Sequence, residues 1–222
     1  QLTCQDGCSL LSTMIAASKE NGGKFPLVRL TKNLRQQGGE TALMKNIMGI
    51  GREGWDGPLL DPSFQVRKFK TADEALKAAA DDFSEGCQMI AFTNKTVDSL
   101  NDMTKGKGVD RVMCTKNIEN PKTGEMKVVN GMIGKRSEGR IVYRNEHVDK
   151  KGRTGNFATD PRPARCLTTH KLQGSEFNET GQLVMTWFKG GIPAELTYTA
   201  MSRFKHKVIV YGESRVLDAA FS

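Results

Sequence analysis

An α/β fold with a mostly parallel sheet covered by helices on both faces is predicted from three observations in this 222-residue sequence. Apolar runs of strand length alternate with segments whose apolar residues recur at helical spacing. Residues 87–92 are apolar almost throughout, as is typical of a strand buried on both faces of a parallel sheet. Between residues 105 and 162 the helical spacing disappears and Gly, Lys, Asn and Thr punctuate short β-like pieces, which predicts a small antiparallel barrel or sheet inserted into the α/β domain.

The first half of the chain supplies the expected elements in order. Apolar spacing and turn residues predict a helix ending at 21–23, a strand over 25–30, a helix over 41–50 and a strand over 64–69. The sequence Thr71-Ala72-Asp73-Glu74 has the pattern of a capping box, so a helix is expected to begin there. A further helix is expected to follow the buried strand and to carry Val97 and Leu100 on its inner face.

The second half predicts two kinds of structure. Inside the insertion, β-like pieces cover 109–115, 126–129 and 140–147, and Asn130-Gly131 is a tight-turn dipeptide. After Pro163 the α/β pattern resumes. It predicts a strand ending at Thr169, a strand over 182–188, a helix over 194–204 and a strand over 207–211.

Composition narrows the class of function. The 33 Lys and Arg against 25 Asp and Glu give a net charge of +8, which favours a polyanionic partner. The five cysteines are scattered and the three histidines lie far apart, so structural thiols and no metal site are expected. No apolar run reaches the roughly 18 residues of a membrane span, and the chain opens without a signal-peptide pattern. A soluble intracellular, cytoplasmic protein with no membrane partner is therefore expected.

Two segments near the C-terminus place hydrogen-bonding groups and cations where a parallel sheet presents its ligand-binding loops. The first is Thr-Thr-His-Lys-Leu-Gln-Gly-Ser-Glu-Phe over 168–177, and the second is Glu-Leu-Thr-Tyr-Thr-Ala-Met-Ser-Arg over 195–203. In this order and at this distance the pair resembles the last two motifs of superfamily 1 helicases. The HKxQG form is most similar to the RecD-like and Dda-like branch.

The resemblance implies a role for each matching residue. Arg203 would be the arginine finger that senses the γ-phosphate. The residues implied to contact single-stranded DNA here are Thr168, His170 and Lys171. Those implied to lie towards the nucleotide are Gln173, Gly174 and Glu176. The alternatives from the residues alone are a surface arginine lying over an amphipathic helix and a capped core histidine at position 170. Phe204 departs from the family pattern, which usually has a small residue there.

Earlier segments extend the resemblance. Residues 91–101 are similar to a family segment in which Thr93 and Asn94 grip the nucleic-acid backbone, although Thr93 could equally be a helix cap. Arg35 follows a predicted strand where the family places an arginine that reaches the ATP phosphates, and Gln1 matches the end of a preceding nucleotide-binding motif. Residues 128–134 match the NGxxG hairpin of the SH3-like barrel that interrupts the second motor domain of this branch.

A helicase motor also needs a Gly-x-x-x-x-Gly-Lys-Ser/Thr loop and an acidic pair for magnesium, and neither occurs in this sequence. The resemblance therefore implies the C-terminal half of an ATP-dependent DNA helicase of 5′ to 3′ polarity, active in DNA replication or repair. The implied division is the end of the first motor domain over 1–24, the second RecA-like (P-loop NTPase type) domain over 25–104 and 163–222, and an SH3-like insertion over 105–162.

ATP and Mg²⁺ would be bound mainly by the N-terminal RecA-like motor domain of the same polypeptide, and single-stranded DNA would be the partner. The chain alone is expected to hydrolyse nothing. Two other classes stay open. One is a non-enzymatic basic nucleic-acid-binding module that binds through its barrel, and the other is an unrelated phosphate-binding α/β enzyme.

Overall fold

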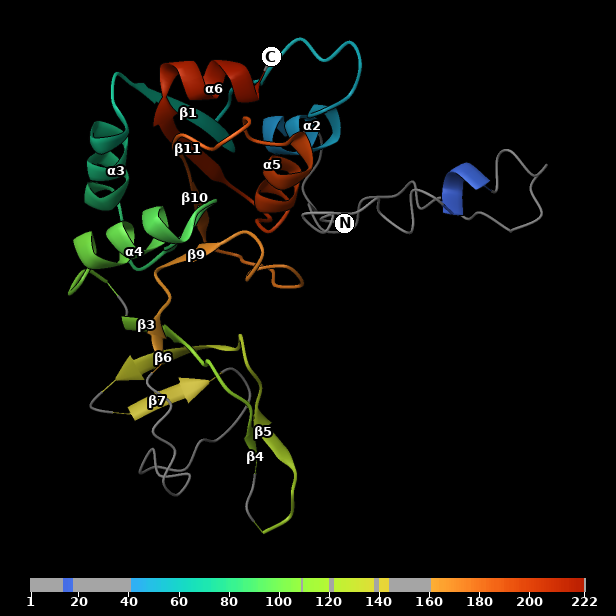
Figure 1. The fold of residues 1–222 in the computed structure, drawn as a ribbon. Coiled ribbons are helices and arrows are strands. Elements are labelled where there is room, and N and C mark those ends of the chain that lie inside the picture. The colour runs from blue at the N-terminus through green and yellow to red at the C-terminus, as the bar shows by residue number, and fades with distance from the viewer. Residues whose placement is uncertain are drawn as a thin grey trace.

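The computed structural model describes residues 14–17, 41–108, 110–119, 122–137, 140–143 and 161–221 (Figure 1). Its main layer is a five-stranded sheet of order β1-β11-β10-β2-β9, in which every pairing is parallel. The strands are β1 (Phe64–Phe69), β2 (Cys87–Ala91), β9 (Cys166–Thr168), β10 (Thr180–Met185) and β11 (Val208–Glu213). The predicted α/β class with a parallel sheet is confirmed.

Helices cover both faces of this sheet. On one face α3 (Ala72–Asp81) and α4 (Asn94–Met103) pack over β11, β2 and β9. The other face carries α2 (Ala42–Gly49), α5 (Ala194–Met201) and α6 (Ser214–Ala220). Every residue of β2 and of β11 is buried, because both strands lie between two helical layers. The helix α6 was not predicted from the sequence.

The helix α3 begins where the capping pattern predicted. The Thr71 hydroxyl accepts a hydrogen bond of 3.2 Å from the backbone N–H of Glu74. The Glu74 carboxylate reaches back to the N–H of Lys70 at 3.1 Å, one residue before the position that a standard capping box would satisfy. Two of the N–H groups at this helix start are thereby paired.

A separate antiparallel layer follows α4. Its larger sheet has the order β7-β6-β3-β8, formed by β3 (Asp110–Met113), β6 (Ile133–Ser137), β7 (Arg140–Tyr143) and β8 (Arg162–Pro163). A second sheet pairs β4 (Ile118–Glu119) with β5 (Met126–Val128). Within the described ranges the larger sheet is open between β7 and β8, so the predicted antiparallel insertion is present as sheets.

The turn at Asn130 and Gly131 corrects one expectation. The N–H of Met132 donates to the Val129 carbonyl at 3.1 Å, and Gly131 has a φ of +89°, a value that favours glycine. The turn is therefore tight, as predicted. It does not close a hairpin, however, because β5 pairs with β4 while the following strand, β6, pairs with β3 and β7. The turn joins two sheets.

Buried arginines hold the antiparallel sheet against the parallel one. Arg111 of β3 donates to the Gln88 side-chain oxygen of β2 at 2.8 Å and pairs with Glu179 at 3.0 Å. Arg165, beside β9, pairs with Asp110 at 2.8 Å. Because a buried guanidinium without a partner is costly, these pairs fix how the two layers meet.

Several predictions fall outside the described residues. Residues 14–17 are helical, as the first predicted helix requires, but the rest of that helix, the predicted strand over 25–30, Arg35 and Gln1 lie outside them. In the part of the chain that the structure describes, no helix has the length and apolar character to cross a membrane.

Candidate functional site

Three adjacent parallel strands end at the same edge of the sheet, and two of them lead into segments that carry predicted site residues. The strand β2 leads into α4 through Thr93, β9 leads into the loop 169–179, and β10 ends beside Thr186. Hydroxyls link two of these ends, since Thr96 lies 2.9 Å from Thr93 and 3.0 Å from Thr186, oxygen to oxygen. Loops at the carboxyl ends of parallel strands are the usual ligand sites of such folds.

The start of α4 is capped as its sequence allows. The Thr93 hydroxyl accepts from the backbone N–H of Thr96 at 3.2 Å, so the capping role is confirmed. This leaves Asn94, the first residue of the helix, exposed to solvent. Of the two, Asn94 has its side chain more available to an outside partner.

A groove of about 410 Å³ runs between α4, the end of β9 and the antiparallel sheet. It brings together Asn94 and Lys171, two residues that lie far apart in the sequence but were both predicted to contact DNA. Arg162 of β8 lines the same groove, with Asp98 and Asp102 on the α4 side. Sequence reasoning missed Arg162, because no local pattern marks a residue that arrives from a different sheet.

The loop after β9 presents some of its polar residues and buries others. His170, Lys171, Gln173 and Gly174 are exposed, so the alternative of a core histidine at position 170 is wrong. Thr168 is buried, and its hydroxyl accepts from the N–H of Lys171 at 3.4 Å. Its hydroxyl therefore shapes the turn that displays the neighbouring side chains.

The backbone conformation at position 174 favours a glycine. Its φ of +92° lies in the left-handed region, while nothing approaches within 4 Å of the position that a Cβ would occupy. The open space leaves the backbone of the loop accessible at this point.

Arg203 links the two motif segments. It is only 8% exposed, which excludes the alternative of an arginine spread over the helix surface. Its guanidinium donates to the Thr199 carbonyl at 3.0 Å, to the Ser202 hydroxyl at 2.9 Å and to the Ser175 carbonyl at 3.3 Å. The end of α5 and the loop after β9 are therefore held together by a cation.

Backbone and ring contacts reinforce this link. The N–H of Phe177 donates to the Arg203 carbonyl at 2.8 Å, and the centres of the Phe177 and Phe204 rings lie 5.7 Å apart. Glu176 pairs with Lys205 at 3.4 Å. The family usually has a small residue at the position of Phe204. The Phe204 ring fits because Gly181 of β10 has no side chain, and a Cβ on Gly181 would lie 2.5 Å from that ring.

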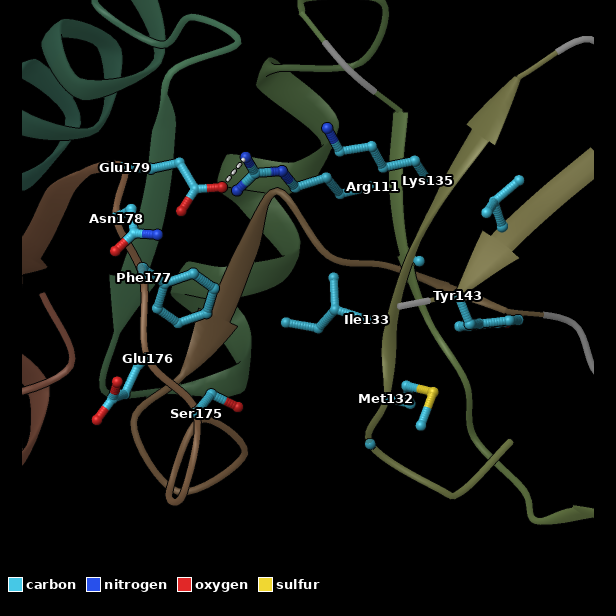
Figure 2. Close-up of a pocket in the computed structure, with 13 residues that line it drawn as sticks. Arg111, Met132, Ile133, Lys135, Tyr143, Ser175, Glu176, Phe177, Asn178 and Glu179 are labelled. Carbon is cyan, nitrogen blue, oxygen red and sulfur yellow. Dashed lines mark hydrogen bonds and ion pairs between the residues drawn. The ribbon is translucent and has the colours of Figure 1, made fainter. Parts of the chain in front are cut away.

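A second cavity of about 750 Å³ lies between residues 175–179 and the antiparallel sheet (Figure 2). Ile133, Met132 and Phe177 give it apolar walls, and the Arg111–Glu179 ion pair crosses one end. Glu176 lines this cavity, whereas Asn94 and Lys171 line the groove. Of the residues expected near the nucleotide, Glu176 thus opens onto one hollow, while two of those expected near DNA open onto the other.

Among the described residues, burial disfavours the charged form of the ionisable groups whose pKa is raised. Burial raises the pKa of the Cys166 thiol well above its ordinary value, so the thiolate is disfavoured. Burial also raises the pKa of Tyr143 to about 12. In the described ranges no three His, Cys, Asp or Glu residues gather in a way that could hold a metal ion.

A known protein shares sequence with part of this chain. The RecBCD enzyme subunit RecD of Haemophilus influenzae is 28% identical over 110 residues, which is 49% of this chain and 16% of that protein. No family model matches the sequence. The similarity indicates a relationship to RecD at the level of part of the chain, and the match spans a small fraction of the length of that relative.

Proposed function

We propose that this chain supplies the second motor domain of an ATP-dependent DNA helicase that moves 5′ to 3′ on single-stranded DNA. In this proposal residues 25–104 and 163–222 form a RecA-like domain, 105–162 form an SH3-like insertion and 1–24 belong to the end of the first motor domain. The partial similarity to RecD supports the class of protein. It would act inside the cell, in DNA replication or repair.

The hydrogen bonds by which Arg203 joins the two motif segments are the observation that carries the proposal. Arg203 ties the end of α5 to the Ser175 carbonyl of the loop that presents His170 and Lys171. A phosphate contact at Arg203 and a strand contact at Lys171 would thus belong to one connected unit. A helicase needs such a connection, because nucleotide chemistry must change the grip on the strand.

The strand grip is assigned to the groove. Asn94 and Lys171 offer an amide and an ammonium to backbone phosphates, and Arg162 adds a second cation from the antiparallel side. Asp98 and Asp102 lie along the same groove and would limit how deeply a polyanion settles. Thr93, Thr168 and His170 complete the proposed strand contacts.

ATP and Mg²⁺ would be held mainly by the first motor domain, and ATP hydrolysis would supply the free energy for movement. From this chain, Arg203 and Arg35 are assigned to the phosphates, with Gln173, Gly174, Glu176 and Gln1 bordering the nucleotide. Because the Arg203 guanidinium already donates to Ser175, a phosphate contact there would be coupled to the position of the loop. A fixed cation of this kind stabilises charge on a transferred phosphoryl group.

Single-strand binding tests the groove. Fluorescence anisotropy with a labelled oligonucleotide should show weak binding, and Asn94→Ala with Lys171→Gln should weaken it by roughly tenfold at low salt, on the order expected when one phosphate is no longer neutralised. Lys77→Gln, an exposed lysine on α3, is the matched control and should leave the affinity unchanged. Equal losses of affinity in both variants would contradict the assignment of the groove.

Hydrolysis tests the division of the motor. The chain alone should show no ATPase activity, and robust turnover would contradict the assignment of ATP to a second domain. In a protein that also contains the first motor domain, Arg203→Ala should abolish hydrolysis more than DNA binding. Arg203→Lys keeps the charge while losing the planar donor set, so loss of hydrolysis in both variants would assign the role to the guanidinium and not to charge alone. Strand binding with no DNA-stimulated hydrolysis in that protein would favour the non-enzymatic binding module.

A further inference from the structure

The positive charge of this chain is concentrated in one segment. Residues 105–162 contain 14 Lys and Arg against 7 Asp and Glu, and so carry +7 of the total net charge of +8. The remaining residues are nearly balanced, although they contain the segments 91–101, 168–177 and 195–203. The motor motifs therefore do not account for the basic character of the protein.

In the described part of this segment the excess charge lies at the surface. Lys105, Lys116, Lys135 and Arg136 are exposed, whereas Arg111 is buried and paired with Glu179. Lys116 and Lys135 form no ion pair with another described residue. Asp110 is already engaged by Arg136 at 3.6 Å and by Arg165 at 2.8 Å, so its carboxylate does not neutralise these lysines.

In its described part, the same segment offers no aromatic ring for base stacking. Its sequence holds two aromatic residues, Tyr143 and Phe157. Tyr143 is 4% exposed, so it presents no ring face to a base, and Phe157 lies outside the described residues. Single-strand binding proteins combine cations with exposed aromatic rings, whereas a duplex offers phosphates on its outside with its bases already stacked.

We infer that the antiparallel sheets form a second nucleic-acid contact, which binds the phosphate backbone of double-stranded DNA without reading its sequence. Figure 1 shows these sheets as a lobe beside β9, with β4 and β5 extending away from the parallel sheet. Arg162 belongs to this lobe and also lines the strand groove, so the two contacts meet there. The inference rests on the proposed function for the choice of nucleic acid over other polyanions.

Salt dependence of duplex binding tests the inference in the full 222-residue chain. The probe is a labelled blunt DNA duplex, and the variant is Lys116→Gln with Lys135→Gln. Each neutralised phosphate contributes about 0.9 to the slope of log affinity against log salt, so the double variant should lower that slope by about 1 to 2. At about 50 mM salt the affinity should fall roughly tenfold for each phosphate that a lysine no longer neutralises.

A charge-matched control shows whether duplex binding depends on these two lysines or only on the net charge of the protein. Lys70→Gln with Lys77→Gln removes the same charge from exposed positions on the parallel-sheet side, and it should leave the slope within error of the parent chain. Equal slopes in all three proteins, or equal decreases in the two variants, would overturn the inference. So would a decrease in affinity for a single strand that exceeds the decrease for the duplex. Circular dichroism should confirm that all three chains are equally folded.

The outcome is distinguishable from failure of the proposed function. If Lys116→Gln with Lys135→Gln weakens duplex binding while Asn94→Ala with Lys171→Gln leaves single-strand binding unchanged, the duplex contact is supported and the proposed motor function is contradicted. If only the groove variant weakens its binding, to single strands, the motor function is supported and the duplex contact is contradicted. Weakened binding to anionic phospholipid vesicles with unchanged duplex binding would assign the lysines to a membrane surface and overturn the inference.

Discussion

Replacing Asn101 with alanine should loosen the edge strand that delivers the loop after β9. The Asn101 side-chain amide donates to the Cys166 carbonyl and accepts from the Cys166 N–H, both at 3.0 Å. Cys166 lies in β9, an edge strand whose other side pairs with β2. The asparagine thus takes the place of a neighbouring strand at this residue.

The size of the effect follows from burial. Asn101 is 6% exposed and Cys166 is fully buried, so Asn101→Ala leaves a backbone donor and a backbone acceptor without partners and with little access to water. Two such groups at about 1 to 2 kcal/mol each give a decrease of about 2 to 4 kcal/mol in the free energy of unfolding. For a domain of this size, the midpoint of thermal unfolding should fall by about 10 °C.

Urea unfolding followed by circular dichroism measures this decrease, and amide hydrogen exchange at Cys166 locates it. Asp102→Ala is the matched control, because Asp102 is the exposed neighbour on the same helix. The control should change stability by less than about 0.5 kcal/mol. A decrease below about 1 kcal/mol in Asn101→Ala, or unchanged exchange at Cys166, would show that the amide does not hold the strand.

Three further changes address packing, backbone conformation and pH. Gly181→Ala should destabilise the fold by about 1 to 3 kcal/mol in urea unfolding, because the new Cβ would lie 2.5 Å from the Phe204 ring. Gly174→Ala should cost about 1 to 2 kcal/mol, measured in the same way, because of its φ of +92°. Burial raises the pKa of Tyr211 to about 12, so its contribution to stability is complete below pH 10 and lost as the pH rises to about 12. The stability difference between the parent and Tyr211→Phe should therefore shrink over that interval.

Each of these expectations has a clear opposite. An unaffected Gly181→Ala would mean that the Phe204 ring moves aside without cost. A Gly174→Ala variant of normal stability would mean that the loop adopts another backbone conformation. A pH-independent difference between tyrosine and phenylalanine at position 211 would mean that the hydroxyl titrates as it does in the unfolded chain.

The positions of most helices and strands follow from local sequence. The capping residues Thr71 and Thr93 both accept from the N–H three residues later, as their sequence context predicts. The apolar run of β2 is buried along its whole length. Such features depend on spacing and on hydrogen bonds between near neighbours, so no tertiary information is needed to find them. The helix α6 was missed, since it is short and has no side-chain cap.

The candidate site was predicted only in part. Residues 168–177 and 195–203 were recognised as a pair, but their connection through the Arg203 guanidinium and the Ser175 carbonyl could not be read from the sequence. The burial of Arg203 could not be read from the sequence either. Whether an arginine at a helix end faces solvent depends on which loop packs against it, and that loop comes from another strand.

By itself, the sequence determined the fold class, most elements of the parallel-sheet layer, the capping of two helices and the basic character of residues 105–162. These properties reside in residue types and short-range spacing. Only the tertiary structure decided that Asn94, Lys171 and Arg162 line one groove, and that the turn at Gly131 joins two sheets. Strand order and the meeting of the two layers depend on contacts between residues far apart in the chain, which no local pattern specifies.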